Sequence, residues 1–551
     1  MSTAQSAAHA SPPLRPSGPP TAGAREWTGL TVLLLPLLLV SMDVSVLYFA
    51  VPFISRDLEP SSTQQLWIFD IYGFVLAGLL ITMGSLGDRI GRRRLLLLGA
   101  FCFSLASLGA AYSHSAGDLI AARALQGVAG ATLMPSTLAL IRNMFHDDKQ
   151  RRTAIAIWTS ATMSGIALGP VLSGFLLAHF WWGSVFLINV PVMILLLTLG
   201  PALVPEFRAP QAGRFDVLSA VLSLAAVLPV IYGMQELSAN GARPAYVAAI
   251  AAGVAVGAAF VMRQARSRAP MIELALFRSR GFTGAVALTL VSMFAIVGFA
   301  IFATQYLQSV RGMTPFTAAL WSLVPMTGTM TAVPLSQLLV KHVDRAYIAG
   351  GGLLAAAGGY ALLTQAQAQS GLWFVLLGAS VYAGGVVAAL TVGNELIMGA
   401  VPPERAGAAA AVVETSSEFG GALGMAVLGS IGVAVYRSEL ARTAPAGLPS
   451  AAADAARNTL GGALGVAGHL PGQLGSQLVA AARVAFTHGL DTAALGAGIA
   501  MLAAAVISAR YFRGIEVVPE GAEHADTSTP RPAPDEDTAG DDAATRPELV
   551  R

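Results

Sequence analysis

The chain has 551 residues, of which 55% are hydrophobic and only 12% are charged. Soluble domains carry about 25% charged residues, so this composition excludes an ordinary soluble protein and favours a membrane protein. The net charge of +2 indicates no nucleic-acid-binding surface, and the single cysteine, Cys102, excludes an intramolecular disulfide.

Long apolar stretches follow one another through most of the sequence, and a stretch of about 20 such residues predicts a transmembrane helix. We therefore expect an all-α polytopic membrane protein with fourteen spans. They are predicted at residues 28–54, 66–86, 94–113, 117–141, 153–178, 183–204, 216–236, 244–262, 281–306, 316–340, 347–367, 371–398, 406–434 and 486–510. The two terminal segments, residues 1–26 and the acidic tail 511–551, are expected to be disordered and cytoplasmic.

The loops between the spans alternate in charge, which predicts how the chain is oriented. Eighteen arginines and lysines fall in the loops of one side, whereas the short loops of the other side hold three, Arg56, Arg243 and Arg311. Basic loops remain in the cytoplasm. We expect a multi-pass protein of the cytoplasmic (inner) cell membrane with both termini in the cytoplasm, as an even number of spans requires.

Several spans contain charged residues, which are costly in hydrocarbon. The acids are Asp43 in the first span, Asp70 in the second, and Glu414 and Glu418, one turn apart, in the thirteenth. Because lipid-facing positions are excluded by this cost, we expect these acids to face a wet central cavity. The alternatives are a solvated position at the helix start for Asp70 and a pair with a cytoplasmic-side arginine for Glu414.

The loop after the second span reads GSLGDRIGRR and contains Gly84, Asp88, Arg89, Gly91 and Arg92. Its glycines permit a close helix crossing and a tight turn. Asp88 can face the N-terminus of a neighbouring helix, and the arginines can anchor to lipid headgroups. On these grounds alone, the cluster could also serve only to orient the chain.

Two later spans carry further motifs. The fourth contains RALQGVAGA, in which the intramembrane Arg123 requires a carboxylate or carbonyl partner. The fifth contains GIALGPVLSG. Its small residues Gly165, Gly169 and Ser173 lie on one helix face and permit close backbone approach, Pro170 bends the helix, and Gly174 ends the motif.

These motifs, together with MDVSVLYFAVP in the first span, resemble those of the major facilitator superfamily. The resemblance covers nearly the whole chain to about residue 510 and is greatest to its fourteen-span drug:proton antiporters, which expel quaternary ammonium compounds, dyes and methyl viologen. Ser45 and Tyr48 stand where that subgroup usually has Thr and Asn, and Ser173 stands where Gly is usual. The resemblance implies that the loop from Gly84 to Arg92 acts as a gate latch and that Gly165–Gly174 is an antiporter signature.

The same resemblance implies a major facilitator fold. It predicts an N-terminal six-helix half at 27–204, an inserted helix pair with its cytoplasmic linkers at 205–280, and a C-terminal half at 281–510. The C-terminal half includes a long external loop, 437–485. Within that loop, GQLGSQLVAAARVAF could form an amphipathic surface helix, and a packed external hairpin without a ligand is the alternative.

Our hypothesis for the site is that Asp43 and Asp70 form an outer cation and proton site, with Glu414 and Glu418 contributing from the opposite half. An ionised acid attracts a cation and a protonated one releases it, which would couple the two movements. Arg123 is a candidate for the same coupling, or merely ties helices together. Aromatic side chains could add cation–π contacts or could only pack: Tyr48, Trp67, Phe69, Tyr72 and Phe419.

We therefore predict a proton-driven exporter of lipophilic or quaternary cationic drugs that works by alternating access and confers multidrug or antiseptic resistance. The alternative is a dedicated exporter of one endogenous metabolite or antibiotic. A membrane enzyme is not expected, since no histidines are spaced for metal binding. ATP-driven transport is not expected either, since no Walker A loop is present. We expect no cofactor, no metal, no nucleic-acid partner, and function as a monomer in the bilayer.

Overall fold

The computed structural model describes residues 21–208, 216–267, 274–340, 342–367, 371–400 and 406–514. These residues form helices and turns with no β-strand, and fourteen helical stretches are long and apolar enough to cross a membrane, which confirms the predicted number. Most of the two tails that we predicted to be disordered, residues 1–20 and 515–551, lies outside the described residues. Residues 24–26 are helical, because the Glu26 side chain accepts the Gly23 N–H at 2.7 Å and caps the first helix.

The first six spans form the N-terminal half. Several of its helices begin after a residue whose side chain accepts a hydrogen bond from a first-turn N–H. These residues are Ser61, Ser115 and Asp147. Helix α4 contacts α1, α2, α3 and α5, and α7 contacts α1 and α3. The helices are α1(Ala24–Asp57), α2(Ser62–Ile90), α3(Arg92–Ala111), α4(Ala116–Met144), α5(Asp148–His179), α6(Ser184–Leu187) and α7(Asn189–Leu203).

The last six spans form the C-terminal half, in which α10 contacts α14, α15 and α18. Its elements are η1(Leu274–Arg278), α10(Arg280–Gln305), the π-helical turn η2(Tyr306–Val310), α11(Pro315–Trp321), α12(Pro325–Leu339), α13(Arg345–Leu363), α14(Leu372–Ala400), α15(Ala406–Thr443), α16(Ser450–Asn458), α17(Leu460–Ala467) and α18(Gly472–Tyr511).

Two segments of this half differ from our predictions. The predicted span 316–340 is two helices, because the chain turns at residues 322–324 and Pro325 starts a new helix. The predicted loop 437–485 is largely helical: α15 extends to Thr443, and α16 and α17 follow. The expected surface helix GQLGSQLVAAARVAF is the first part of α18, since no proline separates it from the last span.

The inserted pair, α8(Val217–Asn240) and α9(Pro244–Arg266), packs mainly on itself. Only 6% of the apolar stretch of α9 is buried, compared with 67% for α4, so α9 lies at the periphery. Helix α8 also contacts α2 of the N-terminal half and α15 of the C-terminal half. The inserted pair is therefore in contact with both halves.

A polar cluster joins the two inserted helices at one end. Asp216 accepts hydrogen bonds from the Ser219 N–H at 3.0 Å and from Arg263 at 2.9 Å. Burial would raise the pKa of the Asp216 carboxyl, but these hydrogen bonds and the Arg263 charge outweigh that effect and lower the pKa below its ordinary value. Asp216 therefore stays ionised and holds α8 against α9.

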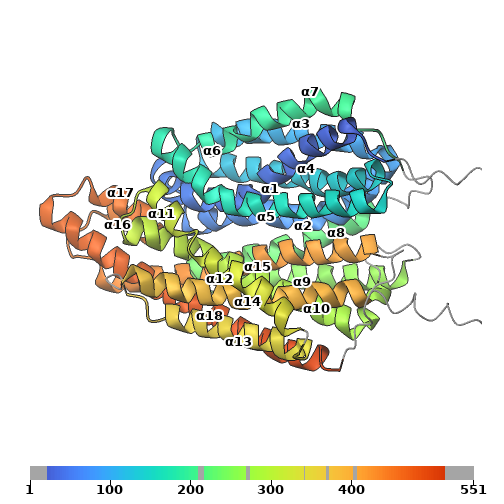
Figure 1. Cartoon of the computed structure of the whole chain (residues 1–551). Coiled ribbons are helices and arrows are strands. Elements are labelled where there is room, and N and C mark those ends of the chain that lie inside the picture. Colours follow the sequence, from blue (N-terminus) through green and yellow to red (C-terminus); the bar gives the residue numbers. More distant parts are fainter. Residues whose placement is uncertain are drawn as a thin grey trace, which may run out of the picture. The chain divides into compact units, whose positions relative to one another are not determined.

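Figure 1 shows the blue and teal helices α1–α7 as one group and the yellow to red helices α11–α18 as another. We use two names for the ends of this bundle. The terminal side is where α1 begins and α18 ends, and the α17 side is the opposite one, which carries α16 and α17. Because fourteen spans are an even number, the chain starts and ends on the same side of the bundle. Each span therefore runs between the terminal side and the α17 side.

The halves meet on the α17 side. Arg437 of α15 donates to Ser62 Oγ at the start of α2 (2.9 Å), and a Cβ added at Gly174, near the end of α5, would lie 2.9 Å from Phe316 Cα of α11. Towards the terminal side, by contrast, Thr159 and Ser160 of α5 are exposed, as is Met330 of α12. The bundle is thus closed between its halves on the α17 side. Helix α5 contacts α11 there, whereas among the described residues it has no extended contact with α12, so α5 and α12 separate towards the terminal side.

Within the C-terminal half, α10 and α15 approach closely at several glycines, one of which is Gly424. A Cβ added at Gly424 would lie 1.9 Å from the Phe294 carbonyl oxygen. We expect Gly424→Ala to destabilise the fold by about 3 kcal/mol, because overpacking costs about 1–3 kcal/mol and here backbone must move. The melting temperature of the purified protein in detergent measures this effect.

The control is Gly351→Ala on α13, where an added Cβ meets no atom within 4 Å. This variant should melt within a degree or two of the wild type, since alanine is also the better helix former. Equal melting temperatures for the two variants would show that the α10–α15 approach is not tight.

Candidate transport site

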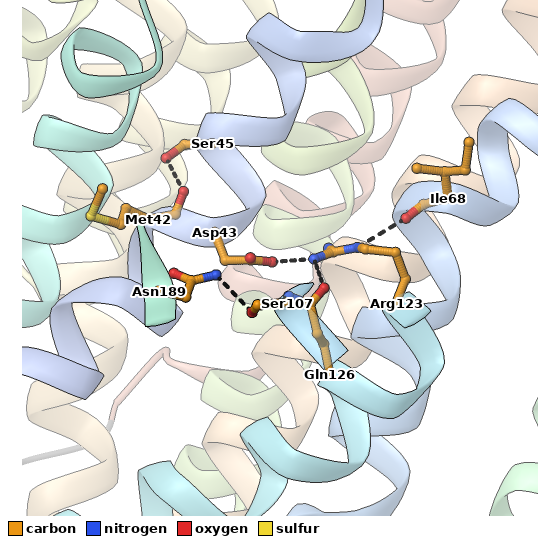
Figure 2. Close-up of polar contacts among 8 residues, drawn as sticks. All are labelled: Met42, Asp43, Ser45, Ile68, Ser107, Arg123, Gln126 and Asn189. Carbon is orange, nitrogen blue, oxygen red and sulfur yellow. Dashed lines mark hydrogen bonds and ion pairs between the residues drawn. The ribbon is translucent and has the colours of Figure 1, made fainter. Parts of the chain in front are cut away.

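Arg123 is the centre of a polar network inside the N-terminal half (Figure 2). Its side chain is fully buried, and Nη1 forms an ion pair with Asp43 of α1. The Nε atom donates to the Ile68 carbonyl of α2 at 3.2 Å, and Nη1 also donates to Gln126 Oε1 at 3.1 Å. Arg123 therefore has both kinds of partner that its intramembrane position predicted, the carboxylate of Asp43 and the carbonyl of Ile68.

The network extends from Arg123 to two further helices. Gln126 donates to Ser107 Oγ of α3 at 2.9 Å, and Asn189 of α7 donates to the same oxygen at 3.2 Å (Figure 2). The guanidinium carbon lies 4.4 Å from the centre of the Tyr72 ring. One arginine thus joins α1, α2 and α4 directly, and α3 and α7 through Gln126. A buried charge with this many partners is stable only while all of them remain.

Asp70 does not lie in this network. It is 1% exposed, which excludes the solvated position that we considered as the alternative. Its Oδ2 accepts a hydrogen bond from Gln235 Nε2 of α8. The expected wet cavity is therefore not what surrounds this carboxyl, because the inserted helix covers it. The structure does not bring Asp43 and Asp70 into direct contact.

Glu414 and Glu418 project from α15 and are partly exposed. Within the described part of the chain, neither forms a hydrogen bond or an ion pair, so the arginine partner considered for Glu414 is not found. Glu418 lies within electrostatic range of Tyr48 on α1 and Tyr72 on α2. Glu418 of the C-terminal half therefore approaches the helices of the N-terminal half, and Glu414 stands one turn before it on α15.

The candidate aromatic side chains mostly contact one another or the protein. Tyr48 stacks on Phe69 with ring centroids 5.4 Å apart, and its hydroxyl donates to the Val297 carbonyl of α10 at 3.5 Å. The Tyr72 ring is already occupied by Arg123. Trp67 and Phe419 pack in an apolar cluster between α2, α8 and α15. Tyr48, Trp67 and Phe419 therefore all lie at the contact between the two halves.

The antiporter signature of α5 packs closely against α1. A Cβ added at Gly165 would lie 2.7 Å from the Leu38 carbonyl oxygen, and one at Gly169 would lie 2.0 Å from Ser45 Oγ. Ser173 donates to the Val46 carbonyl at 2.9 Å, so its hydroxyl adds a bond that glycine could not make. This is the close approach that the small residues predicted. Pro170 lies within α5, and Gly174 then contacts α11 of the other half.

The loop with the latch motif forms a tight turn on the terminal side. Gly91 has a φ of 114°, which side chains disfavour, and an added Cβ would lie 2.5 Å from Glu206 Oε1. Asp88 accepts from Arg92 Nε at 2.8 Å, while Arg89 is exposed and Gly84 lies near Arg92. Among the described residues, these contacts lie within the N-terminal half and the segment that directly follows it, and none of them joins the motif to the C-terminal half.

Sequence reasoning missed one residue of the site, Gln235. It is 1% exposed and bonds to Asp70. A glutamine within an apolar span was the available signal. Among the described residues, no group of three or more His, Cys, Asp or Glu side chains could hold a metal ion.

The fold and these contacts define a polytopic helical membrane transporter, with two six-helix halves that meet at charged and aromatic side chains. The model of the Major Facilitator Superfamily matches residues 33–425, and the chain belongs to that family. Its proteins are transporters, not enzymes. The multidrug efflux pump LfrA of Mycolicibacterium smegmatis is 44% identical over 492 residues, which is 89% of this chain and 97% of LfrA.

Two further proteins are similar to this chain. The methyl viologen resistance protein SmvA of Salmonella typhimurium is 35% identical over 493 residues, covering 88% of this chain and 97% of SmvA. A bacterial homologue of the human lysosomal transporter Spinster, solved in an inward-facing, unoccupied conformation, shares the fold. Its TM-score is 0.63 at 17% sequence identity, over 89% of this chain and 98% of that structure.

Proposed function

We propose that this chain is a multidrug exporter that expels lipophilic or quaternary cations in exchange for protons by alternating access. The likeness to LfrA and SmvA, whose names state multidrug efflux and methyl viologen resistance, supports the export of drugs and cations. Proton coupling is our own inference, and it rests on the acids within the spans. No bound cofactor is needed if the proton gradient drives the cycle.

One observation carries the choice of a cationic substrate. The buried arginine of the N-terminal half is already paired with Asp43, whereas Asp70, Glu414 and Glu418 have no described cation as partner. Acids from both halves thus carry negative charge, or accept protons, beside the contact between the halves. A cation that enters from the open side could bind them, and protons that arrive from the other side could displace it.

We further propose that the terminal side faces the cytoplasm of the cell that carries the protein in its inner membrane. The excess of arginine and lysine in the loops of that side supports this orientation. The conformation described above, closed on the α17 side, would then admit substrate from the cytoplasm. One chain contains both halves and all of these acids, so we propose that it functions as a monomer.

The test is transport of ethidium and methyl viologen by purified protein in liposomes with an imposed pH gradient. We expect both cations to move against the proton flux, and movement to stop when an ionophore collapses the gradient. If well-folded wild-type protein moves neither cation, the dedicated exporter of one metabolite becomes the better reading.

We expect Glu418→Gln to reduce transport of divalent methyl viologen more than that of monovalent ethidium. A dication gains more from each added carboxylate, since the Coulomb energy scales with the product of the charges. The difference should be about tenfold, equivalent to about 1.4 kcal/mol. Rates at equal gradients in liposomes give the ratio.

The matched control is Glu439→Gln on the same helix, whose carboxylate accepts from Arg442 at 2.7 Å. It should leave the ratio of the two rates unchanged. A parallel fall for both cations in Glu418→Gln would argue against a direct role in charge recognition.

A further inference from the structure

The contact between Asp70 and Gln235 leaves two buried oxygens without partners. Gln235 Nε2 donates to Asp70 Oδ2. Within the described part of the chain, neither Asp70 Oδ1 nor Gln235 Oε1 has a hydrogen-bond partner. Both side chains are 1% exposed, so solvent does not compensate. Two unsatisfied buried acceptors on paired side chains are costly, and an added donor would reduce that cost.

A proton on the carboxyl is such a donor. An ionised carboxylate only accepts hydrogen bonds, whereas a protonated one has an O–H group that can donate. With the proton on Oδ1, that O–H can donate to Gln235 Oε1 while Oδ2 still accepts from Nε2. The amide therefore suits the protonated form of Asp70, and it supplies one hydrogen bond to the ionised form.

Helix α8 holds Gln235 firmly against α2. A Cβ added at Gly78 would lie 2.5 Å from the Leu224 side chain, and Ser223 donates to the Gly78 carbonyl at 3.4 Å. One turn before Gln235, α8 joins the apolar cluster that includes Phe74 of α2, Ile231 of α8 and Ala422 of α15. Gln235 is thus fixed at the place where one helix of each half and the inserted helix meet.

We propose that Gln235 is a positioning residue that orients the Asp70 carboxyl to take up and release the transported proton. Helix α8 then takes part in coupling proton movement to export, although it belongs to the inserted pair and not to either six-helix half. This inference rests on the function proposed above, because it assigns a role within proton-coupled export.

Other ionisable groups approach the same part of α2 without replacing Gln235. Arg123 of α4 is engaged by Asp43, and Glu236, next to Gln235, accepts from Asn240 at 2.6 Å. The arginines of α3 lie at its terminal-side end. Tyr48 of α1 lies within electrostatic range of Asp70 and of Glu418 of α15, and Glu414 stands one turn before Glu418. Arg437 of α15 bonds to Ser62 at the start of α2.

The first test is Gln235→Leu, assayed for gradient-driven ethidium transport in liposomes. We expect transport to fall about tenfold, the size of a lost hydrogen bond to a charged group, in protein that is still folded. The matched control is Gln264→Leu in α9, which removes another buried amide of the inserted pair, bonded to Ser219 at 2.7 Å. The control should retain transport. Equal rates for Gln235→Leu and Gln264→Leu would overturn the inference.

The second test exchanges the two groups. Asp70→Asn with Gln235→Glu moves the carboxyl from α2 to α8 and keeps every atom position, because Asp and Asn, and Glu and Gln, have the same shape. We expect the double variant to recover gradient-driven transport relative to Asp70→Asn alone, which a merely structural role for Gln235 would not produce. Transport no higher than in Asp70→Asn would contradict the proposal. A wild type that moves no cation would instead refute the proposed function itself.

Discussion

Arg123→Leu is expected to remove most of the folded protein and to abolish transport in what remains. The substitution deletes three hydrogen bonds and leaves Asp43, which is 7% exposed, as an uncompensated buried charge. Breaking one partner of a buried ion pair costs about 3–5 kcal/mol, a large part of the stability of most proteins. The yield of monodisperse protein and its melting temperature measure the loss.

Two comparison variants separate structure from function at this pair. Arg442→Leu breaks an ion pair with Glu439 in which Arg442 is exposed, and should change the melting temperature little, because exposed pairs contribute about 0–1 kcal/mol. The double variant Asp43→Leu with Arg123→Leu removes both charges, so most of the folded protein should return. We expect it to remain inactive. If this double variant transports at the wild-type rate, the Asp43–Arg123 ion pair only holds helices together and has no role in transport.

Sequence alone predicted the spans but not their interruptions. Fourteen apolar stretches are enough to count the helices, because hydrocarbon admits few other structures. The break before Pro325 divides one predicted span. The segment from Gly472 is predicted as a possible separate surface helix, but its continuity with the last span had no signal beyond the absence of a helix-breaking proline.

For the site, sequence predicted which residues are charged but not which ones meet. The cost of a buried arginine required a partner for Arg123, yet the choice of Asp43, 80 positions away, depends on how α1 and α4 pack. Asp43 and Asp70 are predicted together because both fall in the outer half of their spans. Depth does not specify a helix face, and Asp70 faces α8, where Gln235 reaches it. No pattern in the sequence says where an inserted helix docks.

Asp70→Asn is expected to abolish the export of methyl viologen and ethidium while the protein stays folded. Asparagine has the shape of aspartate, and its carbonyl oxygen can still accept from Gln235 Nε2, so the buried contact persists. What is lost is the ability to exchange a proton and to carry charge. Gradient-driven rates in liposomes should fall at least about tenfold, equivalent to about 1.4 kcal/mol or more.

Asp118→Asn, at an exposed position in the first turn of α4, is the matched control and should transport as the wild type does. Unchanged export of every cation tested by Asp70→Asn would remove Asp70 from the site. Asp70→Asn and Arg123→Leu differ in what they leave behind. Asp70→Asn removes a charge but still accepts the hydrogen bond from Gln235, whereas Arg123→Leu removes a charge and leaves Asp43 without its ion-pair partner. If Asp70 takes up the transported proton, loss of transport must appear in the variant that keeps its fold.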